Sequence, residues 1–218
     1  MIDSRRTWSG WLARIAVVVA LASRPLAAQA SDGGVFLGPF AGVVFATLAG
    51  ADVSSFTSRT DFAAGLQFDQ VFPGGVFIRS GLIYSGRGAT APSVIGDVVF
   101  KQRFVDLPVI VGYRLHTRGP RPFFFGGAQV GLNVGCELED ASGGSTTNIN
   151  CDDSSGNFAL ADLNGVVGAG IAVPAGKAGL TLDVRYLIGL QQIEALIDGK
   201  NRALVIGGAY MFRIGSQR

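Results

Sequence analysis

One segment alternates strictly between two kinds of side chain, and this alternation limits the possible folds more than any other feature. From Leu180 to Leu190 every even position is apolar, while the odd positions include Thr181, Asp183 and Arg185. Successive side chains of a β-strand point to opposite faces. The segment is therefore predicted to be a strand with one apolar face and one charged face.

Other segments repeat this period, some of them less clearly. Phe104–Leu115 follows it most closely, with Asp106 and Arg114 on the charged side. Clusters of Gly, Pro, Asp and Ser separate the segments, as expected between strands. The predicted strands are 35–48, 61–70, 75–86, 104–115, 122–135, 159–173, 180–190 and 201–214.

The connections between these strands alternate in length. The short turns are Pro73–Gly75, His116–Arg121 and Pro174–Lys177. The longer, polar connections are 49–60, 87–99, 136–157 and 192–200. Short periplasmic turns and longer extracellular loops are typical of outer-membrane barrels. The sequence therefore predicts an all-β protein, a closed antiparallel transmembrane β-barrel of about eight strands.

The alternation alone does not tell which face points outward. A soluble β-barrel carrier of a hydrophobic ligand would have the same strands with the charges outside. Three features favour the membrane: only 16% of residues are charged, glycines such as Gly112, Gly189 and Gly207 share the parity of the polar residues, and aromatic residues lie near strand ends. The residues expected in the aromatic girdles are Tyr84, Phe100, Phe124, Tyr210 and Phe212.

The amino-terminal segment has the features of an export signal. Arginines precede a short apolar run at 15–22, and Ala28–Ala30 offers the small residues that signal peptidase requires. The apolar run is shorter than the roughly 20 residues that a helical anchor needs. We therefore expect a cleaved signal peptide at 1–30 and an outer-membrane β-barrel domain at 31–218, integral to the bacterial outer membrane.

The charged faces of the strands are expected to meet inside the barrel. Barrels of about eight strands are filled by side chains, and buried charges persist only when they are paired. We therefore expect an interior network of opposed charges and no wide channel. Its predicted members are Arg79, Asp106, Arg114, Asp162, Asp183, Arg185 and Arg213.

The sequence offers no arrangement for catalysis. Its single histidine, His116, lies in a predicted turn, so a Ser-His-Asp or Cys-His site cannot form in the longer loops. No catalytic, cofactor-binding or metal-binding residue is predicted. The two cysteines, Cys136 and Cys151, flank one polar stretch and are predicted to form a disulfide in an oxidising compartment. A net charge of +2 provides no basic surface for nucleic acid.

Two neighbouring motifs resemble a known family. Phe104–Tyr113 reads FVDLPVIVGY, and Pro122–Gly127 reads PFFFGG after a short turn. This pairing is similar to the PorT-type outer-membrane β-barrel domain, also called the outer-membrane protein β-barrel family. The resemblance covers about Gly34–Ile214 and implies a barrel in the outer membrane. It brings no shared catalytic residue, and some members of the family take part in protein secretion.

The end of the chain also carries a recognisable signal. Tyr210 and Phe212 resemble the carboxy-terminal signal that the barrel assembly machinery reads, although Arg213–Arg218 follow Phe212 here.

These observations predict a small non-enzymatic outer-membrane barrel whose surface-exposed loops have a structural or binding role in the cell envelope. The expected partners are outer-membrane lipid, the barrel assembly machinery and a protein on the extracellular or periplasmic side. The alternatives are a component of a protein secretion or envelope-assembly system, implied by the family resemblance, and the soluble carrier.

Overall fold

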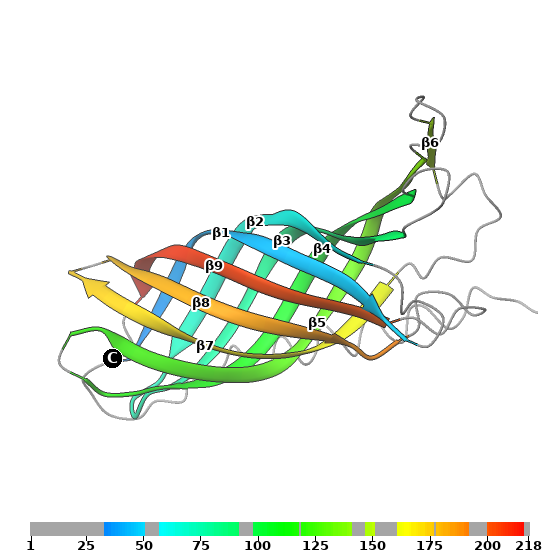
Figure 1. Ribbon diagram of the computed structural model, residues 1–218. Helices are drawn as coiled ribbons and strands as arrows, with labels where there is room; N and C mark the ends of the chain where they lie inside the picture. Colours follow the sequence, from blue (N-terminus) through cyan, green and yellow to red (C-terminus); the bar gives the residue numbers. More distant parts are fainter. Residues whose placement is uncertain are drawn as a thin grey trace, which may run out of the picture.

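The chain folds into one closed antiparallel barrel (Figure 1). The computed structural model describes residues 33–50, 57–91, 98–117, 119–140, 147–150, 161–176, 178–191 and 200–215. The barrel strands are β1 (Gly34–Ala49), β2 (Thr57–Val71), β3 (Val76–Ala91), β4 (Val98–Arg114), β5 (Arg121–Asp140), β7 (Ala161–Ala175), β8 (Ala178–Gly189) and β9 (Lys200–Gly215). A short strand, β6 (Thr147–Asn150), pairs with the far end of β5. No helix in the described part of the chain is long and apolar enough to cross a membrane.

Each barrel strand pairs with its neighbour along the chain, and pairing of β1 with β9 closes the ring. Around the ring the order is β1, β2, β3, β4, β5, β7, β8 and β9, so β3 lies opposite β8. The predicted barrel of about eight strands is confirmed.

Side-chain burial alternates along the strands with the predicted parity. On β8 the even positions from Leu180 to Ile188 are exposed, and the odd positions from Thr181 to Leu187 are buried. On β4, Leu107 is exposed and Asp106 is buried. A continuous apolar exterior of this kind suits lipid and not water. The soluble-carrier interpretation is therefore wrong, because it requires the charges on the outside.

The two ends of the barrel differ, and we name them by their connections. At the turn end short connections join β2 to β3, β4 to β5 and β7 to β8, and the loop end is the opposite end of the strands (Figure 1). In the first turn Gly74 and Gly75 have φ angles of 90° and 89°, which other L residues rarely adopt. Glycine at both positions therefore permits the tight reversal between β2 and β3.

Strands at the loop end extend further than predicted. Residues 87–99 and 136–157 were expected to be loops, yet β3 continues to Ala91 and β4 begins at Val98. The glycines in this stretch suggested a loop but have a different role. Gly88 has a φ of 145°, and a Cβ there would collide with the carbonyl of Phe100 on β4. The strands pair closely because that Cβ is missing.

The extra length carries the strands beyond the bilayer. A membrane-spanning β-strand needs about 9–11 residues, whereas β5 has 20. With the apolar band of such barrels about 25 Å tall, the loop-end parts of β3, β4 and β5 project past it.

Glycines inside the barrel make room for aromatic rings. A Cβ at Gly112 would lie 2.4 Å from Cζ of Phe77, and one at Gly207 would lie 2.5 Å from Cζ of Phe40. Both distances are far below van der Waals contact. The interior is therefore packed too tightly for any side chain at these positions.

We predict that Gly112→Ala destabilises the barrel by about 1–3 kcal/mol, because the new methyl group overpacks the interior. Gly126→Ala is the matched control, since a Cβ there has its nearest neighbour at 3.6 Å. Urea unfolding in phospholipid vesicles measures both variants. Equal midpoints for the two variants would contradict the packing argument.

Candidate functional site

An arginine at the centre of the lumen links opposite walls of the barrel. Arg79 on β3 is 0% exposed. Its guanidinium donates two hydrogen bonds to Asp69 on β2, at 2.8 and 2.9 Å, and one to Asp183 on β8, at 2.9 Å. Arg185 donates two more to Asp183, at 2.8 and 3.0 Å, and one to Gln67 at 3.3 Å. We call these five residues the turn-side network.

Aromatic rings surround the arginines of this network. The guanidinium of Arg79 lies 5.2–5.6 Å from the ring centres of Phe77, Phe123 and Phe125. That of Arg185 lies 4.5 Å from the ring centre of Phe40. These are cation–π distances. The rings exclude water from the ion pairs and hold the guanidinium groups in place.

A second network lies nearer the loop end. Arg87 on β3 contacts Asp106 on β4 at 2.6 Å and Asp162 on β7 at 3.1 Å. The hydroxyl of Ser85 donates to Asp106 at 2.6 Å. Two amides donate to Asp162, Asn164 at 3.1 Å and Asn201 at 3.0 Å. These residues form the loop-side network, which again joins strands that are not neighbours in the sheet.

The predicted interior charges are distributed over three places. Asp183, Arg79 and Arg185 belong to the turn-side network, and Asp106 and Asp162 belong to the loop-side network. Arg114 approaches the turn-side network, with 3.7 Å between its Nη2 and Oδ2 of Asp69. Arg213 joins neither network: it donates to the carbonyl of Gly33 and pairs with no described carboxylate.

Two central members of the networks were missed from the sequence. Arg87 was assigned to a loop, although Ser85, Arg87 and Ala89 continue the buried parity of β3. Asp69 lies in a predicted strand and shares the buried parity of Gln67 and Val71, which was the available signal.

Other predicted residues lie on the outside or near the loop end. Tyr210 and Phe212 are exposed on β9 with ring centres 4.9 Å apart, and Phe124 is exposed near the turn end. Tyr84 packs against the exposed ring of Phe62, with 5.8 Å between ring centres. Phe100 was expected in a girdle but is buried. It belongs to the inward face of β4, because the even positions of that strand point into the barrel.

The structure describes one of the two cysteines of the predicted disulfide. Cys136 is buried on β5, and Cys151 lies outside the described residues. The pairing therefore stays a prediction.

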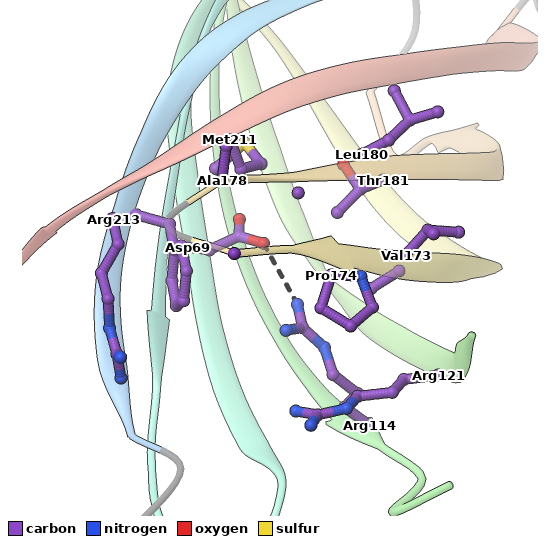
Figure 2. A pocket seen from close by; sticks show the side chains of 14 residues that line it. Asp69, Arg114, Arg121, Val173, Pro174, Ala178, Leu180, Thr181, Met211 and Arg213 are labelled. Carbon is purple, nitrogen blue, oxygen red and sulfur yellow. Dashed lines mark ion pairs between the residues drawn. The ribbon is translucent and has the colours of Figure 1, made fainter. Parts of the chain in front are cut away.

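A pocket with a volume of 200 Å³ opens at the turn end of the lumen (Figure 2). Its charged lining residues are Asp69, Arg114, Arg121 and Arg213. Phe36, Met211 and residues of β7 and β8 complete the wall. Figure 2 shows Arg114 and Arg121 on one side of this turn-end pocket and Arg213 on the other.

We predict that Arg79→Met destabilises the barrel by about 3–5 kcal/mol, because Asp69 and Asp183 lose their shared buried cation. Arg103→Met on the outer wall removes the same charge from an ion pair with Glu137. The side chains of Arg103 and Glu137 are 49% and 33% exposed. Its effect should stay within about 1 kcal/mol. Unfolding in urea distinguishes the two, and similar losses would mean that the central pair contributes no more than a surface one.

Comparison with known proteins adds to this geometry. No relative of the chain was found among the curated proteins. Solved structures with similar architecture include Neisserial surface protein A, at 15% identity and a TM-score of 0.49, covering 83% of this chain and 99% of that one. Ail of Yersinia pestis is 17% identical with a TM-score of 0.39, and the match covers 82% of this chain and 99% of that one. The outer membrane enzyme PagL is 12% identical with a TM-score of 0.45, and the match covers 81% of this chain and 99% of that one. At such identities and TM-scores nothing about function follows.

A family model also matches the chain. It extends over residues 27–194 and is described as the outer membrane protein beta-barrel domain. With more than half of the chain matched, the protein belongs to the outer membrane protein beta-barrel domain family and is a small barrel of the bacterial outer membrane.

Proposed function

We propose that this barrel is a closed, non-enzymatic anchor that holds polar loops at the cell surface, with a structural or binding role in the envelope. The observation that carries the proposal is the filled lumen. The bond from Arg79 to Asp183 joins β3 to β8 across the barrel. The bond from Arg87 to Asp162 crosses at a second level. A lumen obstructed twice by buried ion pairs favours anchoring over transport.

The expected result in a planar bilayer is the absence of steady open conductance. Both networks must break before ions pass, and each contains buried charges that depend on their partners. A matched variant, Arg79→Ala with Arg87→Ala, removes both cross-lumen cations and is expected to raise the conductance if it folds. Retention of the heat-dependent gel shift identifies folded barrels. A steady open channel in the unaltered protein would refute the proposed closure.

The extended strands support a surface role for the loops. The loop end projects beyond the apolar band, and in outer-membrane barrels this end is extracellular. The connections 51–56, 92–97, 141–146, 151–160 and 192–199 contain no histidine, and each contains Ser, Gly or Asp. Binding at these loops therefore needs no catalytic group.

We predict that an epitope inserted at 141–146 is detected by antibody on intact cells. The same epitope inserted at 116–120, in the turn between β4 and β5, should be detected only after the outer membrane is permeabilised. Flow cytometry provides the readout. Surface labelling of the second insertion on intact cells would reverse the proposed orientation.

The non-enzymatic part of the proposal is supported by the position of the single histidine. His116 is exposed in a turn-end connection. A Ser-His-Asp or Cys-His site at the loops would need a histidine beside a nucleophile. The loop end has no histidine.

The PorT-type resemblance of Phe104–Tyr113 suggests a second candidate, a component of a secretion or envelope-assembly system. Deletion of the gene distinguishes the two. Blocked export of other proteins would favour the secretion role, and intact export with changed adhesion or membrane integrity would favour the anchor.

We further propose removal of residues 1–30 on export, a Cys136–Cys151 disulfide, and recognition of Tyr210 and Phe212 by the assembly machinery.

A further inference from the structure

The turn-end pocket gathers more positive charge than its carboxylate can balance. Arg114, Arg121 and Arg213 line it, and Asp69 is the one carboxylate among its described lining residues. These side chains come from four different strands, β2, β4, β5 and β9. The arrangement therefore results from the closed barrel and not from a local run of basic sequence.

Asp69 is already engaged elsewhere. Both of its carboxylate oxygens accept hydrogen bonds from Arg79, at 2.8 and 2.9 Å. Arg114 reaches the same carboxylate only at 3.7 Å. The other carboxylate of the turn-side network, Asp183, is shared between Arg79 and Arg185. Asp69 is therefore shared between Arg79 and Arg114, and neither carboxylate pairs with Arg121 or Arg213.

The arginines of the pocket also have unused hydrogen-bonding capacity. The Nε atoms of Arg114 and Arg121 are buried and have no acceptor. Unsatisfied buried donors are uncommon in folded proteins, and a buried cation without a counter-charge is costly. Both observations point to an acceptor that carries negative charge.

Within the lumen, the loop-side network shows no such excess of cations. In the loop-side network the balance is reversed, because Arg87 alone faces the two carboxylates Asp106 and Asp162. The interior as a whole is therefore not uniformly basic. The uncompensated guanidinium groups lie where the lumen opens, at the end that faces the periplasm in this class of barrel.

We propose that the turn-end pocket binds a phosphoryl group, supplied by a phospholipid headgroup of the inner leaflet or by soluble phosphate. Guanidinium groups present paired donors that match phosphate oxygens. A phosphate monoester carries about −1.5 to −2 charge at neutral pH, so it balances more of the excess than a single carboxylate does. The pocket volume of 200 Å³ and its partly apolar wall suit a headgroup-sized ligand.

The first experiment is calorimetric titration of the detergent-folded, lipid-free protein with inorganic phosphate, at constant ionic strength maintained with chloride. The expected result is saturable binding. Arg121→Gln removes one guanidinium and should weaken binding about tenfold, as expected for loss of one charge-assisted contact. Arg121→Lys keeps the charge but not the paired donors, so its phosphate affinity should lie between those of the unaltered protein and Arg121→Gln.

A test variant and its matched control lie on the same strand, β9. Arg213→Gln, at the turn end of β9, is expected to weaken phosphate binding. Arg202→Gln, exposed at the loop end of the same strand, removes the same charge and should leave binding unchanged. The heat-dependent gel shift shows that each variant is folded. Equal weakening by Arg202→Gln would overturn the proposal, since it would reduce the effect to overall charge.

A second measurement separates the two sources of the phosphoryl group. Native mass spectrometry of protein from mixed micelles reports retention of phosphatidic acid against phosphatidylcholine. Retention of phosphatidic acid that depends on Arg121 supports a lipid headgroup, and phosphate binding without such retention supports the soluble ligand. If neither inorganic phosphate nor phosphatidic acid binds the unaltered protein, the pocket is not a phosphoryl site.

Discussion

The ion pair between Arg79 and Asp183 is the contact on which the rest of the interior depends. It joins β3 to β8, which lie opposite each other in the ring. Because both groups are buried, each requires the other to remain charged. The second carboxylate on Arg79 and the second arginine on Asp183 extend this requirement to neighbouring strands. Buried apolar side chains then fill the space that the ion pairs leave, and the interior glycines make room for the aromatic rings among them.

The exterior of the barrel is apolar, and its lumen holds buried charges together with apolar side chains. Strand alternation produces both surfaces from one backbone, since each residue faces either lipid or lumen. The exterior needs only apolar side chains of any shape. The interior needs specific partners, because a buried charge tolerates few neighbours. The interior networks therefore restrict the choice of side chain more than the lipid-facing positions do.

Much of this could be predicted from the sequence, and the failures have physical causes. Parity along Leu180–Leu190 located the strand and placed its charges on one face, and the low charge content and the positions of the glycines then favoured turning that face inward. The partner of Arg79 could not be predicted, since it depends on strand tilt and stagger around the ring. Arg87 was missed because the glycines beside it resemble a loop. Opposite Arg103 and Phe104, β5 has one extra residue between Asn133 and Gly135, and this bulge interrupts the alternation of β5.

Closure of the ring by β1 and β9 has a kinetic consequence. The first and last strands of the barrel must meet before either has its second neighbour. The hydrogen bond between Arg79 and Asp183 likewise joins residues 104 positions apart. Contacts of such long range make folding slow, because the chain loses its entropy before they form. A chain that lacks its final strand retains two open edges and an unsealed interior, so this barrel assembles as a whole or not at all.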